Sequence, residues 1–227
     1  ASSRRLTELI MNEPLSLRVT EVFTSLQGEA LTSGFPTTFI RLTGCPLRCA
    51  YCDSDYAFRG GEQRSIANLV SASRTSGANL VCVTGGEPLA QPNCLSLLTS
   101  LCDAGLEVSL ETSGAFDVSD VDPRVSIVLD LKTPGSGESA KNLLSNLELI
   151  SEKDQIKVVV TNEDDFRWFE LLCDEHPSIF RAGVVWISPS YDEIDLQVLA
   201  RLIIESPHPF RMQLQLHKQI WGKEPGR

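Results

Sequence analysis

The chain has 227 residues, of which 42% are hydrophobic and 22% are charged, an ordinary composition for a globular protein. Its 20 basic and 30 acidic residues give a formal net charge of -10. So acidic a chain is a poor candidate for binding nucleic acid or an anionic membrane surface, because both favour basic patches. No apolar run approaches the roughly 18 residues that cross a bilayer, and the N-terminal stretch lacks the apolar core of a secretory signal. We therefore expect a cytoplasmic protein with no membrane or nucleic-acid partner.

Short apolar runs alternate with stretches of helical periodicity along the chain. Strands are expected at 17–23, 37–43, 79–83, 106–111, 125–131, 155–161, 183–188 and 211–217. Helices are expected at about 65–76, 93–104, 139–150, 163–175 and 192–205. This alternation implies a parallel sheet with right-handed crossovers, and the six strands between 37 and 188 are too few for a closed eight-stranded barrel. We predict an α/β fold built as an open, partial barrel, with a wound sheet as the alternative.

Several of these strands carry polar residues on one face only. The polar positions are Ser109, Glu111, Asp130, Lys132, Gln213, Gln215 and His217. Strands covered on both sides are nearly all apolar, so these strands are expected either to line a wet cavity or to lie at an edge that faces solvent. Polar residues at the carboxyl ends of strands favour the cavity, because α/β folds place their sites there.

Seven cysteines, an odd number, include three within eight residues. Cys45, Cys49 and Cys52 have the spacing C-x3-C-x2-C, and a loop can fold so that three thiolates reach one metal centre. Structural zinc usually takes a fourth ligand nearby, whereas three cysteines on a four-iron cluster leave one iron open to a small molecule. A zinc site completed by a distant residue is the alternative. The remaining cysteines lie on apolar helical stripes or within a strand and are expected in the core: Cys82, Cys94, Cys102 and Cys173.

The cysteine loop resembles the cluster-binding loop of the radical S-adenosylmethionine (SAM) superfamily, and the segment TGGEP at 84–88 resembles its GGE motif. Further segments are similar to those of the 7-carboxy-7-deazaguanine synthase family: SLQGE at 25–29, FIRLTGC at 39–45, CDS at 52–54, ETSG at 111–114, DLK at 130–132 and QLHK at 215–218. The resemblance covers 17–218, where we expect a single radical SAM core. Residues 1–16 would form an N-terminal extension, native or partly the remnant of a tag, and 219–227 a C-terminal tail.

The resemblance implies a partial (β/α)6 barrel, a [4Fe-4S] cluster, SAM, Mg2+ and a homodimer. It also implies a lyase that converts 6-carboxy-5,6,7,8-tetrahydropterin to 7-carboxy-7-deazaguanine, by radical ring contraction with loss of ammonia. The product would feed the biosynthesis of queuosine or another 7-deazapurine. The reduced cluster would cleave SAM to a 5′-deoxyadenosyl radical, with an electron donor such as a flavodoxin-type protein.

The same resemblance assigns roles to individual residues, none of them catalytic beyond the cofactors. The cluster ligands would be Cys45, Cys49 and Cys52, and the magnesium ligand Ser54. The SAM-binding residues would be Tyr51, Asp53, Gly85, Gly86, Glu87, Ser113, Lys132 and Ser188. The substrate-binding residues would be Leu26, Gln27, Gly28, Glu29, Arg41, Thr84 and His217. Ser54 departs from the family's usual threonine, but serine keeps a hydroxyl oxygen that suits Mg2+.

Arg41 attracts attention without any resemblance, because it stands inside the apolar run TTFIRLT. Arginine is rarely buried without an anionic partner. A bidentate grip on a substrate carboxylate would supply one, and an internal salt bridge to Glu or Asp is the alternative.

Two other functions remain open from the sequence. A radical SAM activase, which installs a glycyl radical on a partner protein, shares the cysteine spacing. A non-enzymatic metal-binding module would need only the three cysteines. The SLQGE segment and Arg41 favour a small carboxylated substrate over the activase, and the metal content of the protein would identify a metal-binding module.

Overall fold

The computed structural model describes residues 14–222 and 224. Its strands are β1 (Ser16–Leu26), β2 (Pro36–Leu42), β3 (Glu62–Ser65), β4 (Leu80–Gly85), β5 (Glu107–Thr112), β6 (Ser126–Leu131), β7 (Gln155–Val160), β8 (Val184–Pro189) and β9 (Phe210–Met212). Its α-helices are α2 (Ile66–Thr75), α3 (Cys94–Asp103), α4 (Glu163–Glu175), α5 (Leu196–Glu205) and α6 (Leu216–Trp221). The expected N-terminal extension at 1–16 and tail at 219–227 fall partly outside the described residues.

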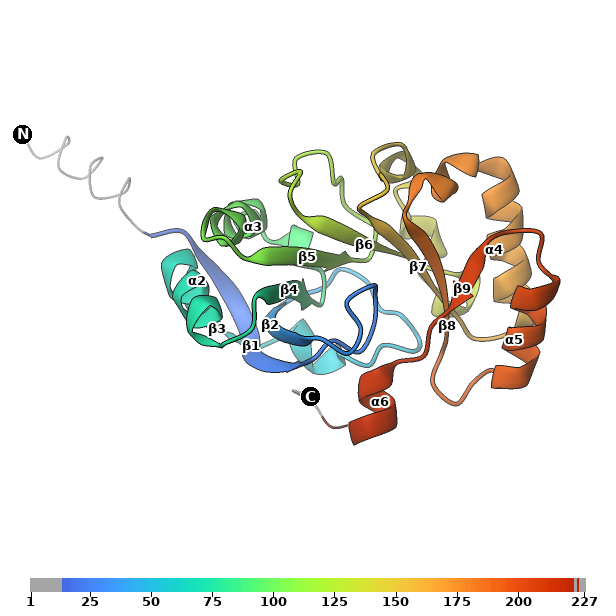
Figure 1. Cartoon of the computed structure of the whole chain (residues 1–227), viewed down its shortest axis with the longest axis horizontal. Coiled ribbons are helices and arrows are strands. Elements are labelled where there is room, and N and C mark those ends of the chain that lie inside the picture. The colour runs from blue at the N-terminus through green and yellow to red at the C-terminus, as the bar shows by residue number, and fades with distance from the viewer. Residues whose placement is uncertain (1–13, 223, 225–227) are drawn as a thin grey trace, which may run out of the picture.

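One nine-stranded sheet organises the chain, in the order β3-β1-β2-β4-β5-β6-β7-β8-β9. β2 and the strands β4 to β9 pair in parallel, and β1 pairs antiparallel with both β2 and β3. In the described part of the chain β3 and β9 do not pair, so the sheet stays open. Figure 1 shows the twisted sheet, with α2 and α3 beside its N-terminal strands and α4 and α5 beside its C-terminal strands. The predicted single-domain α/β fold and its six core strands are confirmed.

The helices cover the sheet through apolar stripes that the sequence already displays. In α3, Leu97, Leu98 and Leu101 are fully buried in the main core. The cysteines expected in the core, Cys82, Cys94, Cys102 and Cys173, are all buried there or within a strand. The α4 helix begins where the Asn162 side chain accepts a hydrogen bond from the Asp165 backbone N–H at 3.0 Å, a regular N-cap. None of the described helices has the length and apolar character that crossing a bilayer requires, and α4, with 13 residues, is the longest.

The predicted helix at 139–150 is wrong. The segment forms short 3-10 turns at Ser139–Lys141 and Leu144–Glu148. Asn142 exchanges two hydrogen bonds with the backbone of Lys132, at 2.8 and 2.9 Å, and Asn146 donates to the carbonyls of Gly114 and Phe116. These side chains bond neighbouring loops instead of facing solvent, and such contacts override helical periodicity.

The predicted last strand at 211–217 is also mostly wrong. Only Phe210–Met212 pair with β8, and α6 begins at Leu216. The chain leaves the sheet because Gln213 donates from Nε2 to the Ala30 carbonyl at 3.4 Å and the Leu216 N–H donates to the Gly28 carbonyl at 2.9 Å. The C-terminal segment therefore lies against the loop that follows β1. The predicted helix at 192–205 begins later, at Leu196, where Asp195 is the N-cap.

Candidate active site

A cavity of about 630 Å³ opens at the carboxyl ends of the parallel strands. It collects most of the residues predicted for the site: Leu26, Gln27, Gly28, Glu29, Arg41, Cys45, Cys49, Tyr51, Cys52, Asp53, Ser54, Thr84, Gly85, Gly86, Ser113, Lys132 and His217. Two predicted residues, Glu87 and Ser188, are fully buried and do not line it. A cavity at this edge is where an α/β fold places its chemistry.

The cysteine loop forms one wall of this cavity, and its three thiols are free. The loop leaves β2 at Gly44, whose φ of +100° favours glycine. Burial raises the pKa of each of the three thiols, so binding a metal centre would have to displace their protons. In an iron–sulfur cluster each thiolate binds a separate iron atom, and three free thiols of one loop around one cavity fit that demand.

The glycine pair at the end of β4 lies against β2 and the cysteine loop. A Cβ atom on Gly85, which has a φ of +155°, would lie 2.3 Å from the Leu42 carbonyl oxygen. A Cβ atom on Gly86 would lie 2.4 Å from the Gly44 oxygen and 2.7 Å from the Cys45 Cβ. Gly85 therefore lies directly against the end of β2 and Gly86 directly against the cysteine loop, so a side chain at Gly86 would push that loop away.

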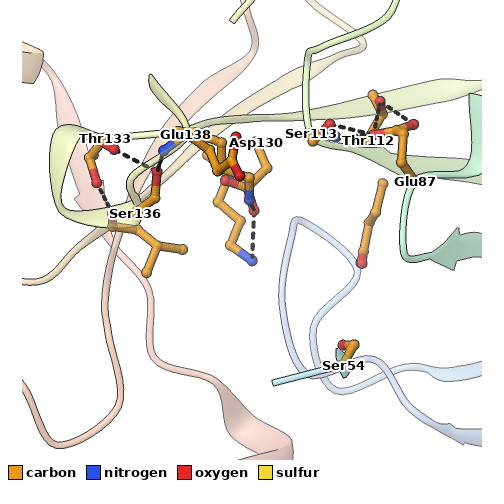
Figure 2. Close-up of polar contacts among 12 residues, drawn as sticks. Ser54, Glu87, Thr112, Ser113, Asp130, Thr133, Ser136 and Glu138 are labelled. Atoms are coloured by element: carbon orange, nitrogen blue, oxygen red, sulfur yellow. Dashed lines mark hydrogen bonds and ion pairs between the residues drawn. The ribbon is translucent and has the colours of Figure 1, made fainter. Parts of the chain in front are cut away.

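Glu87 does not line the cavity but forms hydrogen bonds with Thr112 and Ser113 at its edge. It is fully buried, and its carboxylate accepts hydrogen bonds from the Thr112 hydroxyl at 2.9 Å and from the Ser113 backbone N–H at 2.7 Å. The Ser113 hydroxyl donates to the same carboxylate. Figure 2 shows these three side chains converging at the ends of neighbouring strands. Glu87 thus orients Ser113, which does line the cavity.

Asp130 and Lys132 follow one another along the end of β6 and form an ion pair, with Lys132 Nζ 3.0 Å from Asp130 Oδ2. Despite desolvation, Asp130 holds the pKa of Lys132 above its usual range. Burial raises the pKa of the neighbouring Tyr51 hydroxyl. Asp130 Oδ1 and the Ser188 hydroxyl are buried without a hydrogen-bond partner among the residues the structure describes. Unsatisfied buried polar atoms beside a cavity fit a polar ligand such as SAM, whose amino and hydroxyl groups could supply the missing bonds.

Glu111, at the end of β5, joins two of the predicted substrate residues. Its carboxylate accepts from the Thr84 hydroxyl at 3.0 Å and from Gln27 Nε2 at 3.4 Å. Thr84 and Gln27 are both buried, so their orientation is set by the protein. These groups offer a bound molecule a fixed set of donors and acceptors.

Arg41 has an internal partner. Its Nε donates to Glu21 Oε1 at 2.7 Å, and the Tyr56 hydroxyl donates to the same oxygen at 2.8 Å. The internal salt bridge considered from the sequence is therefore present. Arg41 also lines the cavity, and its terminal nitrogens have no hydrogen-bond partner among the described residues. The two nitrogens that a bidentate contact needs thus remain open to a ligand.

His217 lies in α6 and not in the strand that its alternation predicted. A Cβ atom on Gly28 would lie 2.1 Å from its Nδ1, so only glycine leaves room for the imidazole. Burial lowers the pKa of His217 although the nearby Glu29 opposes the shift. The imidazole therefore reaches the cavity as a neutral group that can donate and accept.

Asp53 and Ser54 close the cysteine loop beside the C-terminal segment. The Ser54 hydroxyl donates to Asp53 Oδ1 at 2.9 Å, and Lys218 Nζ lies 2.8 Å from Asp53 Oδ2. Although desolvation opposes it, Lys218 holds the pKa of Asp53 well below its usual range. Among the described residues, no three His, Cys, Asp or Glu side chains converge on a single ion. Ser54 offers one oxygen, and Mg2+ commonly takes few protein ligands and keeps several waters.

Several cavity residues were not predicted as site residues: Glu111, Asp130, Lys157, Gln215 and Lys218. Glu111, Asp130 and Gln215 belong to the polar strand faces noted in the sequence. Lys157 is a single charge inside the apolar run QIKVVV, the same signal that singled out Arg41. Lys218 stands in the QLHK segment that resembles the family, but nothing in the sequence indicates its pairing with Asp53, which is remote in the chain.

Comparison with known proteins gives consistent results. Residues 39–127 match the family model described as Radical SAM superfamily. A protein of Methanospirillum hungatei named 7-carboxy-7-deazaguanine synthase is 42% identical over 206 residues, which are 90% of this chain and 85% of that protein. A protein of the same name from Chlorobaculum tepidum is 36% identical, with 94% and 98% covered.

A solved structure agrees with these relatives. The crystal structure of QueE from Escherichia coli superposes with a TM-score of 0.73 at 25% identity, covering 89% of this chain and 95% of that one. The relatives match the chain over nearly all of its length and so include the cysteine loop, the glycine pair and the strand ends around the cavity. The chain therefore belongs to the 7-carboxy-7-deazaguanine synthase family of the radical SAM superfamily.

Proposed function

We propose that this chain converts 6-carboxy-5,6,7,8-tetrahydropterin to 7-carboxy-7-deazaguanine, with ring contraction and loss of ammonia. The observation that carries the proposal is the single cavity that joins three free thiols to a set of oriented polar side chains. The thiols suit an iron–sulfur cluster, and the polar side chains suit a flat, carboxylated heterocycle. The named relatives carry the same activity in their names.

Cys45, Cys49 and Cys52 would hold a [4Fe-4S] cluster, and Gly85, Gly86 and Ser113 would border SAM at the fourth iron. When bound, the cluster and SAM together supply a carbon radical that takes a hydrogen atom from the substrate. Tyr51, Asp53, Glu87, Lys132 and Ser188 are further candidates for the SAM side. Of these, Glu87 would act through Ser113, to which it is hydrogen-bonded. Ser188, whose buried hydroxyl has no hydrogen-bond partner among the described residues, does not line the cavity, so its assignment to SAM rests on the resemblance.

The substrate side would consist of Leu26, Gln27, Gly28, Glu29, Arg41, Thr84 and His217. The open nitrogens of Arg41 would grip the pterin carboxylate. Gln27 and Glu29 would read the amide and amino edge, because an amide can donate and accept whereas a carboxylate only accepts. Gly28 leaves the space in which His217 can approach the ring. Enclosure by these side chains would orient the substrate and keep the radical from water and side reactions.

We propose Mg2+ as a further component, with Ser54 as its protein ligand. Ser54 lines the cavity, and its hydroxyl would hold the ion, which commonly takes few protein ligands and keeps several waters. Replacing the family's usual threonine by serine keeps the oxygen, so the expected consequence is an altered affinity for Mg2+ and not its loss.

The proposal also includes an electron donor, a homodimer and a cytoplasmic location. An electron donor such as a flavodoxin-type protein would approach the cysteine loop, where Arg48 and Lys141 are exposed positive charges, partly offset by Glu138, which pairs with Lys141. A homodimer could bury Leu31 and Phe35, which are 51% and 59% exposed on the loop between β1 and β2. A reducing cytoplasm would keep the free cysteines reduced.

The test is an anaerobic assay of the reconstituted protein with carboxytetrahydropterin, SAM and a chemical reductant, with and without Mg2+. The expected result is 7-carboxy-7-deazaguanine and ammonia in equal amounts, with faster turnover when Mg2+ is present. SAM cleavage only in the presence of a partner protein would instead indicate an activase. A colourless protein that holds one zinc after reconstitution would indicate a metal-binding module. Neither alternative has support in the names of the relatives.

A further inference from the structure

Lys157 stands in the middle of β7, where an otherwise apolar strand passes the cavity. Its side chain is only 11% exposed, and its ammonium group forms an ion pair with Glu29 Oε2. The other oxygen of Glu29 accepts a hydrogen bond from Gln215 Nε2 at 2.6 Å. Both oxygens of this buried carboxylate are thus held by the protein, and two of its roughly four lone-pair positions stay open.

We propose that Lys157 is a positioning residue for Glu29: its ammonium keeps the buried carboxylate ionised and turned so that its open lone pairs accept N–H groups of the substrate. This inference rests on the proposed function, since it needs Glu29 to face the amino and amide edge of the pterin. Lys157 itself acts through Glu29.

The loop that carries Glu29 is held in place by the same strand. Gln155, two residues before Lys157 and buried, accepts from the Leu31 backbone N–H at 2.9 Å and from Trp186 Nε1 at 2.8 Å. Ala30, between Glu29 and Leu31, has a φ of +64°. A non-glycine residue in this region costs roughly 1 kcal/mol and persists only when its surroundings enforce it. Strand β7 therefore fixes the loop at two points, and Lys157 is the charged one.

The charged groups around Glu29 make Lys157 necessary for keeping the Glu29 carboxylate ionised. Desolvation opposes ionisation of Glu29, yet Lys157 and the hydrogen bond from Gln215 hold its pKa below the usual value. The other titratable groups that face this pair are Glu111 of β5, Asp130 of β6, Asp53 of the cysteine loop and His217 of α6. Lys157 Nζ also lies 3.9 Å from Asp130 Oδ2. The three carboxylates cannot stabilise a negative charge on Glu29, and the neutral imidazole of His217 does so weakly. Without Lys157, burial would therefore favour protonated Glu29, whose added proton blocks an acceptor position.

The test compares Lys157→Met with a matched control, Lys153→Met, in the reconstituted enzyme. Lys153 also pairs with a buried carboxylate, that of Asp154 at 2.6 Å, but it precedes β7 and does not line the cavity. Loss of a hydrogen bond to a charged group predicts that Lys157→Met raises KM for the carboxypterin about 10- to 100-fold, with a smaller effect on kcat. The acid limb of kcat/KM should move to higher pH. Lys153→Met should change neither. An unaltered KM and acid limb in Lys157→Met would overturn the inference.

A second measurement does not depend on turnover. The melting temperatures of Lys157→Met, Glu29→Gln and the double variant form a mutant cycle. Each single variant leaves a buried group without its partner, so the double variant should be less destabilised than the sum of the two. Additive losses would show that the two groups are not paired, and the inference would fail. If the wild-type enzyme did not convert the pterin, the proposed function would fail, while this cycle would still decide whether Lys157 and Glu29 are coupled.

Discussion

Substitution of Gly86 by alanine tests how tightly the cluster loop is fitted to the end of β4. The added Cβ would lie 2.4 Å from the Gly44 oxygen, 2.7 Å from the Gly44 carbonyl carbon and 2.7 Å from the Cys45 Cβ. Two of these atoms belong to the backbone, so no flexible side chain can swing aside. Ordinary contacts of this kind are about 3.5 Å or longer, and the loop must therefore move by about 1 Å.

The cost can be worked out from what that movement disturbs. Overpacking of a filled site costs about 1–3 kcal/mol. The hydrogen bond from the Glu87 N–H to the Gly44 oxygen, 2.9 Å long, would be strained as well, and such a bond contributes about 1 kcal/mol. A total of about 2–4 kcal/mol corresponds to a fall in melting temperature of roughly 4–16 °C for a domain of this size. Since Cys45 follows Gly44 directly, the same shift should displace a cluster ligand.

The assay is the iron content of anaerobically reconstituted protein, together with the melting curve of the protein before reconstitution. Gly105→Ala is the matched control, because Gly105 has a φ of +80° and nothing within 4 Å of the added Cβ. It adds the same methyl group with backbone strain alone, about 1–2 kcal/mol. Gly86→Ala should lose iron and Gly105→Ala should keep it. Equal iron contents in the two variants would refute the close fit described here.

Three further predictions concern single residues. Replacing any one cysteine of the triplet by serine should abolish the brown cluster, whereas Cys102→Ser should retain it; a cluster that survives in a triplet variant would contradict the ligand assignment. Arg41→Met should raise KM for the carboxypterin about 10- to 100-fold without loss of iron, and Glu21→Gln, which removes only the negative charge beside Arg41 Nε, should raise it less than about threefold; equal effects would make Arg41 structural. Because burial lowers the pKa of His217, the unfolded chain takes up that proton first, and the free energy of unfolding should fall as the pH drops below 6.5. The free energy of unfolding of His217→Asn, measured by urea unfolding, should fall less steeply over the same pH range. Parallel pH curves for the variant and the wild type would exclude this role of His217.

The strands of the fold could be predicted from sequence because the strands of a parallel sheet, covered on both faces, form short runs of apolar residues. The runs 81–83, 127–129 and 158–160 are continuously apolar, and the structure buries them on both sides. The helix expected at 139–150 had an equally regular pattern. It fails because Asn142 and Asn146 bond backbone groups of distant loops, and nothing in the local sequence identifies those partners.

The site likewise has parts that the sequence predicts and parts that it does not. The cysteine loop and the glycine pair are contiguous segments whose spacing already implies their geometry. The pairing of Glu29 with Lys157, and of Asp53 with Lys218, joins segments that are far apart in the chain. Only the fold brings those charges together. Lys157 could have been noted as a lone charge in an apolar strand, but its partner could not be named.

The measurement that tests the central claim most directly is product formation with SAM as the limiting component. The family resemblance implies that SAM is regenerated in each cycle. Anaerobic enzyme, given excess carboxytetrahydropterin and reductant, should therefore form many molecules of 7-carboxy-7-deazaguanine for each molecule of SAM supplied. Product that stops at one molecule per SAM, or SAM that is cleaved while the pterin remains unchanged, would contradict it.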